Sequence, residues 1–108
     1  MKEEDFLQIA RKKAKAGKLE LSEHAVDEAF SEAITVQDIR QALSHEKAQV
    51  LEPYPDDPRG PSCLFVGPAV DGRWIHVVVG GFDRERLIVI TVYRPEPPKW
   101  KDPFTRGG

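Results

Sequence analysis

Apolar and polar residues follow two different periods along this chain, and the period changes near Lys47. Before that residue, apolar side chains recur every three or four positions, as expected for helices that bury one side. After it, apolar side chains alternate with others or form short unbroken runs, as expected for strands. The pattern therefore predicts a helical first half and a sheet in the second half, which is an α+β fold.

The first predicted helix covers residues 4–16. Gly17 follows at a position where glycine often ends a helix, because glycine adopts a left-handed conformation at little cost. A short strand is expected next, at residues 19–21. The side of the helix that is expected to be buried holds Phe6, Leu7, Ile9, Ala10 and Ala14.

Two further helices are expected before the change of period. One begins after Ser22, a residue type that caps helix N-termini. The other begins at Thr35, which forms a capping box with Asp38, while Ile34 and Ile39 occupy the positions of a hydrophobic staple. The residues expected to be buried are Val26, Ala29, Phe30 and Ala33 in the first of these helices, and Val36, Ile39 and Leu43 in the second.

The second half contains four predicted strands. Between the second and third strands, Asp71-Gly72 is a residue pair that favours a two-residue hairpin turn. Such a turn places Gly67 opposite His76. In the next hairpin, a pairing of Gly80 with Leu87 places Thr91 on the other side of the same histidine. The predicted strands are residues 48–54, 62–70, 73–80 and 86–94, with a proline-rich loop at 53–61.

With these two registers, one face of the sheet is uniformly aliphatic, and the helices are expected to cover it. That face holds Leu64, Val66, Ile75, Val77, Val79, Ile88, Ile90 and Val92. The opposite face is chemically mixed and holds Phe65, Gly67, Trp74, His76, Val78, Val89, Thr91 and Tyr93. His76 is thus expected outside the main core, either as a half-buried residue satisfied by its neighbours or as a functional imidazole.

Composition adds limits to this picture. The chain has 108 residues, of which 40% are hydrophobic and 31% charged, as in a single globular domain over residues 1–108 with a proline-rich tail at 95–108. The sequence has no membrane-spanning run or signal peptide, and its one cysteine, Cys63, favours a cytoplasmic location. The net charge of -2 argues weakly against nucleic-acid binding, because phosphate affinity depends on clustered Lys and Arg.

The histidines and the cysteine are the main candidates for chemistry. His24 begins a helix, where the helix dipole favours a neutral ring that can act as a base; an ordinary surface histidine is equally consistent with this place. His45 lies near a helix C-terminus and is assigned no function. Cys63 is expected to be a small buried hydrophobic residue. No pair of these residues has the spacing of a metal motif, so no metal or other cofactor is predicted.

Several segments resemble a small prokaryotic family, the domain of unknown function 4258, over about residues 19–100. They are "LSEHAVDEAF", "YPDDPRGPSCLFVG", "IHVVVG" and "IVITVYRPEPPKW". That family is in turn similar to the RelE and BrnT toxins. The resemblance implies N-terminal helices on one face of a mainly antiparallel four- to five-stranded sheet. It also implies RNA, the ribosome or an antitoxin-like protein as a partner.

The resemblance leads to a first hypothesis, a metal-independent endoribonuclease. Such an enzyme needs a base for the 2′-hydroxyl, an acid for the leaving oxygen and cations for the phosphate. His76 and His24 are the candidate acid and base, and Tyr93 is a candidate proton donor or phosphate ligand. The candidate substrate-binding residues are Arg73, Trp74, Thr91 and Arg94.

The second hypothesis is a non-catalytic binding module. The same sheet face would dock a protein partner or a small ligand through an aromatic anchor made of Phe65, Trp74 and Tyr93. The two hypotheses are separated by RNA cleavage, because DNA lacks the attacking hydroxyl and a binding module cleaves neither.

Overall fold

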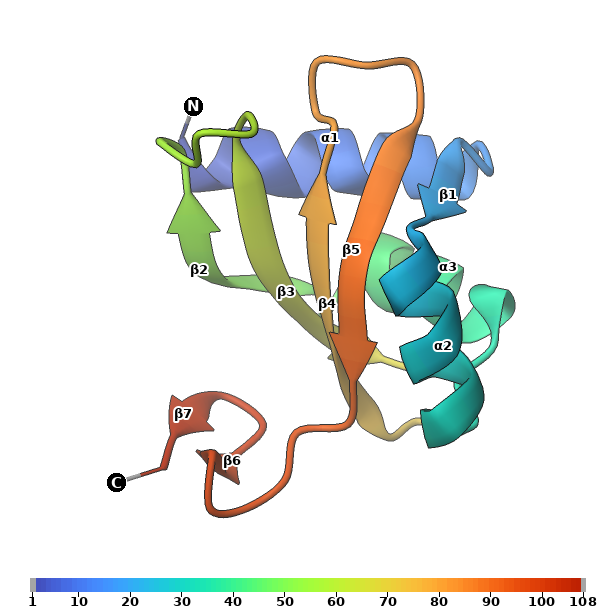
Figure 1. Cartoon of the computed structure of the whole chain (residues 1–108), viewed down its shortest axis with the longest axis vertical. Helices are drawn as coiled ribbons and strands as arrows, with labels where there is room; N and C mark the ends of the chain where they lie inside the picture. Colours follow the sequence, from blue (N-terminus) through green and yellow to red (C-terminus); the bar gives the residue numbers. More distant parts are fainter. Residues whose placement is uncertain (1, 108) are drawn as a thin grey trace.

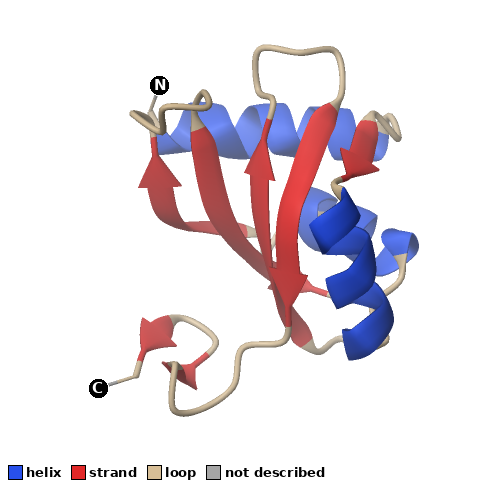
Figure 2. Cartoon of the chain, in the orientation of Figure 1, coloured by secondary structure: helices blue, strands red, loops and turns tan. Residues whose placement is uncertain are grey.

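Helices and strands form two layers in the computed structural model of the chain, which describes residues 2–107 (Figure 1, Figure 2). The helices are α1 (Glu3–Lys15), α2 (Glu23–Glu32) and α3 (Val36–Ser44). The strands are β1 (Leu19–Leu21), β2 (Gln49–Tyr54), β3 (Ser62–Pro68), β4 (Trp74–Gly80), β5 (Leu87–Tyr93), β6 (Trp100–Asp102) and β7 (Thr105–Arg106). Among residues 2–107, no helix is long and apolar enough to cross a membrane.

The main sheet has five strands in the order β1-β5-β4-β3-β2. β1 runs parallel to β5, and every other neighbouring pair is antiparallel. This arrangement confirms the predicted α+β fold with a mainly antiparallel sheet of four to five strands. α1 and α3 pack behind the sheet in Figure 1, whereas α2 lies along its β5 side.

The helix starts follow from local hydrogen bonds. The hydroxyl of Ser22 accepts a bond from the backbone N–H of Ala25, at 3.1 Å. The predicted capping box at the start of α3 is confirmed, because Thr35 and Asp38 each accept a bond from the other's backbone N–H, at 3.0 and 2.9 Å. The two helices therefore begin where the sequence places their caps.

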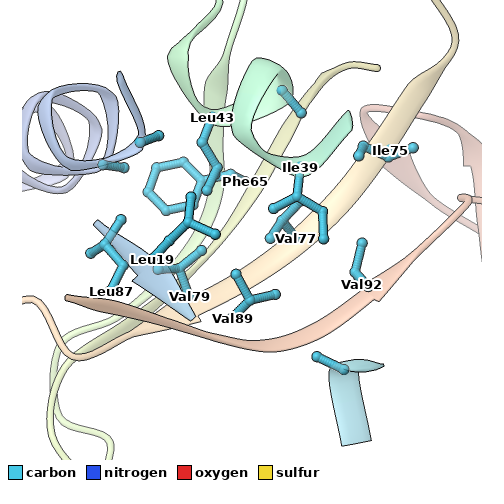
Figure 3. Close-up of a cluster of buried hydrophobic side chains, with 14 of the residues drawn as sticks. Leu19, Ile39, Leu43, Phe65, Ile75, Val77, Val79, Leu87, Val89 and Val92 are labelled. Carbon is cyan, nitrogen blue, oxygen red and sulfur yellow. The ribbon is translucent and has the colours of Figure 1, made fainter. Parts of the chain in front are cut away.

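The main core lies between the sheet and the helices (Figure 3). Ile39 and Leu43 of α3 are fully buried, and in Figure 3 Ile39 points towards Val77 and Leu43 towards Phe65. Cys63 is also fully buried there, and burial raises the pKa of its thiol to about 12, so it is the unreactive small residue that was expected. α1 contributes the predicted side, with Phe6, Ala10 and Ala14 buried and Leu7 and Ile9 partly buried.

The prediction for the buried side of α2 is wrong. Val26 and Phe30 are 51% and 89% exposed, and the helix buries Ala25 and Ala29 instead. Small residues on the inner side let the helix approach β5 closely. Two glutamates of that side then accept bonds from backbone N–H groups at the edge of β5 that β1 leaves unpaired. Satisfying this edge decides the rotation of α2 and turns its larger apolar residues outward. The predictions for Ala33 and Val36 are also wrong, since both are exposed.

The β3–β4 turn contains three residues, not the two that were predicted. Gly72 has a φ of 87°, so its left-handed conformation closes a three-residue loop after Ala69. This one-residue difference moves His76 opposite Val66 instead of Gly67. Because side chains alternate along a strand, it also exchanges the faces of β3. Phe65 therefore lies in the main core, and Leu64 and Val66 lie on the other face.

The predicted β4–β5 register is wrong as well. Gly80 pairs with Ile88 and His76 pairs with Tyr93. A β-bulge between Val78 and Val79 leaves Ile90 without a partner. The pairing of β5 with β4 therefore differs by one residue between the two halves of β5. On β4 the predicted faces hold, but on β5 Val89 faces the helices and Ile88 and Ile90 do not.

Gly67 has a different reason to be glycine from the one expected. A Cβ atom on this residue would lie 2.0 Å from the carbonyl oxygen of Ala42, in the backbone of α3. Gly67 thus permits close packing of α3 on the sheet instead of leaving room beside the imidazole of His76.

Residues 95–108 were expected outside the central sheet, and β6 and β7 form a separate two-stranded sheet. We call residues 100–106 the C-terminal hairpin. In Figure 1 it lies apart from the helices, near the end of β5 and the start of β4. The hairpin thereby reaches the face of the sheet that the helices leave free, which we call the outer face.

Candidate functional site

His76 lies on the outer face of β4, between Val66 on β3 and Tyr93 on β5. The predicted position away from the helices is therefore confirmed. The expected half-burial is not, because His76 is 0% exposed. The ring is closed off by the C-terminal hairpin, a segment whose fold the sequence pattern did not indicate.

Two hydrogen bonds fix the proton of the imidazole. Nε2 lies 2.6 Å from the carbonyl oxygen of Pro103, and Nδ1 lies 3.1 Å from the hydroxyl of Tyr93. A carbonyl oxygen can only accept, so Nε2 carries the hydrogen and donates it. Nδ1 then accepts from the tyrosine hydroxyl. His76 is held as one neutral tautomer.

Burial keeps this histidine neutral. Loss of water around the ring lowers the pKa of His76, while the bond to Pro103 and the carboxylate of Glu52 act in the opposite direction. Burial likewise raises the pKa of the Tyr93 hydroxyl. The pair is thus uncharged around neutral pH, and both ring nitrogens have partners.

Trp100 of the C-terminal hairpin packs over the imidazole of His76. Its ring meets the imidazole of His76 edge-on, with centroids 4.3 Å apart, and the residue is 2% exposed. The indole Nε1–H is buried and has no hydrogen-bond acceptor among the described residues. Trp74, on the same face of β4, packs edge-on against Phe104 of the hairpin at 5.0 Å. Aromatic contacts therefore supply most of the cover.

An ion pair holds the hairpin to the edge strand. The guanidinium of Arg106 donates two bonds to the carboxylate of Glu52, at 2.6 and 2.7 Å, in the bidentate geometry that arginine favours. The hydroxyl of Tyr54 donates to the same carboxylate at 2.5 Å. The bonds from Arg106 are the main reason that the pKa of Glu52 falls to about 2, whereas burial and this carboxylate raise the pKa of Tyr54 to about 12.

Two cations of the tail lie over aromatic rings of this site. The ammonium of Lys99 is 5.4 Å from the ring centre of Tyr93, and the guanidinium of Arg106 is 4.8 Å from that of Trp100. Sequence reasoning did not single out Glu52, Lys99 or Arg106. The signal that could have found the last two was the basic and aromatic composition of "KWKDPFTR".

His24 does not join this cluster. Its Nε2 lies 3.2 Å from the carboxylate of Glu28, and its side chain is 68% exposed at the start of α2. The carboxylate of Glu28 also accepts a bond from the backbone N–H of Val92, on β5. Among residues 2–107, no hydrogen bond or aromatic contact links His24 to His76.

The predicted substrate-binding residues lie in three places. Trp74 is half-buried beside the hairpin, and Thr91 is half-buried opposite Val78. Arg73 is exposed and pairs with Asp71 in the β3–β4 turn. Arg94 donates to the carbonyl oxygens of Glu32 and Ala33 at the end of α2. Both arginines are thus committed to other groups.

A hollow of about 310 Å³ lies elsewhere, lined by loop residues after β2 and after β4 and by two side chains of β5. Arg59, Asp57, Asp83 and Arg84 give it charges of both signs. No residue predicted for the site lines it. The histidine–tyrosine pair beneath the hairpin therefore remains the candidate site.

The fold and the site define an α+β protein with a buried histidine–tyrosine pair on its outer sheet face. The chain belongs to the family described as Domain of unknown function (DUF4258), whose model matches residues 21–94. The match includes His24, His76 and Tyr93 and ends before the C-terminal hairpin. Neither the curated proteins nor the solved structures contain a detectable relative.

Proposed function

We propose that this protein is a metal-independent RNA-cleaving enzyme of the RelE and BrnT class. Its reactive surface is the outer face around His76, and the structure is its closed form. The observation that carries this proposal is the hydrogen-bonded pair of His76 and Tyr93 on the face free of helices. RNA, free or on the ribosome, is the proposed substrate.

The reaction needs groups that this pair can provide. A base removes the proton of the 2′-hydroxyl, the 2′-oxygen attacks phosphorus, and the bond from phosphorus to the 5′-oxygen breaks. An acid then protonates the leaving 5′-oxygen, which gives a 2′,3′-cyclic phosphate and a 5′-hydroxyl. We assign the base to His76 and the acid to Tyr93, because His24 pairs with Glu28 on α2 and lies outside this cluster.

The hairpin controls which atom of the histidine can act. In the closed form the carbonyl of Pro103 keeps the proton on Nε2, so this nitrogen cannot accept another. Once the hairpin leaves, the proton can move to Nδ1 and bond to the oxygen of Tyr93. Nε2 is then a free base on the outer face, held in orientation by the tyrosine.

The remaining predicted residues take supporting roles in this proposal. Trp74, released from Phe104, offers a ring on which an unpaired base can stack. Thr91 lies on the same face as a hydrogen-bonding group. Arg73 and Arg94 are the proposed phosphate ligands, and each must first exchange its present partner.

The test releases the hairpin in the full-length chain. Arg106→Glu replaces the bond to Glu52 by a repulsion between two carboxylates, so the hairpin opens. We expect this variant to cleave single-stranded RNA at least about tenfold faster than the native chain, as for a shift of about 1.4 kcal/mol in the opening equilibrium. The reversed pair, Glu52→Arg with Arg106→Glu, should close the hairpin again and restore the slow rate.

Three controls identify the chemistry. His76→Gln in the opened variant should lower the rate by about 10²–10⁴, the usual contribution of a general acid or base. DNA of the same sequence should stay intact, and a metal chelator should have no effect. If the opened variant leaves RNA intact, or if His76→Gln cleaves as fast, the proposal is wrong.

The second candidate function is the non-catalytic binding module. The full burial of His76 and the satisfied state of both its nitrogens favour it, because the outer face then serves to bind a peptide segment. Of the predicted anchor, Trp74 and Tyr93 lie at this face, but Phe65 lies in the main core. A module of this kind predicts that the opened variant cleaves nothing and binds an added peptide of residues 95–108, and that Trp100→Ala in the peptide abolishes binding.

A further inference from the structure

One face of α2 carries two large apolar side chains that no other residue among 2–107 covers. Val26 is 51% exposed, and Phe30, one turn further on, is 89% exposed. Glu23 and Asp27 lie on the same face, since positions 23, 26, 27 and 30 follow the helical spacing. We call these four residues the exposed side of α2.

The helix cannot turn to hide this face. On its inner side, Ala25 and Ala29 are buried against the sheet. Glu28 and Glu32 on that side accept bonds from the backbone N–H groups of Val92 and Arg94, at 3.1 and 3.4 Å. Rotating α2 would leave these two N–H groups, in β5 and just after it, without partners. The exposure of Phe30 is thus a fixed property of the fold.

The segment that carries this face has charge of one sign, and the cation at its end, Arg94, is already bonded to backbone carbonyls there. Residues 19–39 contain six acidic residues and no lysine or arginine. Glu23 and Asp27 are exposed beside Val26, and neither has an ion-pair partner among the described residues. An apolar pair flanked by unpaired carboxylates matches a partner with apolar and cationic side chains.

We propose that the exposed side of α2 binds a basic amphipathic helix of a partner protein. The partner's apolar side chains cover Val26 and Phe30, and its lysines or arginines meet Glu23 and Asp27. A second copy of the chain would oppose two acidic faces, and RNA or an anionic membrane would also be repelled. This proposal is independent of RNA cleavage, because it uses no residue of the outer sheet face.

The test uses a defined peptide in place of the partner. A peptide of about 18 residues, with leucine along one helical side and lysine elsewhere, is long enough to form a helix. Binding to the full chain is measured by fluorescence anisotropy. We expect one peptide per chain, with an affinity that falls as salt is raised. The same design with glutamate in place of lysine should not bind.

Variants locate the binding. Val26→Ser with Phe30→Ser should weaken binding by at least about tenfold, since burying even one such side chain is worth about 1.5–3 kcal/mol. Asp27→Lys should weaken it by a few-fold and reduce the salt dependence. Glu4→Lys, which changes an exposed acid on α1, should bind as the native chain does. Unchanged thermal unfolding would show that the α2 variants still fold.

Several outcomes overturn the proposal. These are equal binding by the double serine variant, equal binding of the glutamate peptide, or a loss of binding in the Glu4→Lys control. Sedimentation of the free chain supplies a further one. A dimer that disappears on Phe30→Ser would assign this face to a second copy instead.

Discussion

Both faces of the sheet bury side chains, but by different means. The face towards the helices buries aliphatic side chains beneath α1 and α3, which are held by their own backbone bonds and caps. The outer face buries His76 beneath a hairpin that pairs with no strand of the main sheet. Single side-chain bonds, an ion pair and aromatic contacts hold that hairpin in place.

This difference predicts two levels of stability. Opening the helix face requires loss of the apolar core, which is global unfolding. Opening the outer face requires only that the hairpin lifts, and a segment without ladder hydrogen bonds to the main sheet opens at a lower free energy. A site on the outer face can therefore be covered and uncovered while the rest of the fold persists.

The largest expected effect is at Gly67. Gly67→Ala places a methyl group against the backbone of Ala42, where nothing flexible can move, and we expect a loss of about 3 kcal/mol or more in the free energy of unfolding. The matched control is Gly80→Ala on the outer face, whose new methyl group would lie 3.1 Å from the movable end of Ile90. It should cost less than about 1 kcal/mol. Urea unfolding measures both, and equal losses would contradict the comparison.

Ile75 and Trp100 test the two kinds of cover directly. Ile75→Ala removes a fully buried side chain from the helix face and should cost about 2–5 kcal/mol in urea unfolding. Trp100→Ala should cost only about 1–2 kcal/mol, because it can remove no more than the free energy of hairpin docking. Hydrogen exchange should then speed up in residues 100–106 and remain slow in β4. Exchange that rises equally in both would show a single cooperative unit.

The smallest effect is a dependence of hairpin docking on pH. Burial lowers the pKa of His76 in the closed form, so the open form binds the proton more readily. Docking is therefore fully stable above about pH 6.5, the ordinary pKa of histidine, and weakens as the pH falls below that value. The fluorescence of Trp100 should report this change.

His76→Gln is the control for this prediction and should remove the change near pH 6. A second loss should remain as the pH falls from about 4.3, the ordinary value for glutamate, towards the pKa of about 2 held by Glu52 in the closed form. A transition near pH 6 that persists in His76→Gln would assign the effect to another group.

The helices and strands could be predicted from the sequence because their signals are local. The capping box at Thr35 and Asp38 fixed the start of α3, and the alternation of Ile75, His76 and Val77 placed the imidazole opposite the core. Neither depends on residues far along the chain. Tyr93 was placed on the same face as His76 for this reason, although the predicted pairing put Thr91 opposite His76, two residues from the observed partner Tyr93.

The hairpin registers could not be predicted, because they depend on single backbone conformations. The left-handed Gly72 lengthened one turn by a residue, and the bulge beside Ile90 shifted β5. The rotation of α2 was set by the unpaired edge of β5, which its own apolar pattern does not reveal. The rotation of α2 is thus decided by bonds between distant parts of the chain, and the two registers by the conformation of single residues.

By itself, the sequence determined the order of the elements from α1 to β5 and the side of β4 on which the imidazole lies, since these rest on periodicity and on neighbouring residues. Only the tertiary structure decided that His76 is enclosed and that Phe30 is exposed. In both cases the reason is a contact across many residues, between Pro103 and His76 in one and between Glu28 and Val92 in the other. Burial is a property of what packs against a side chain, and that partner is fixed only once the chain has folded.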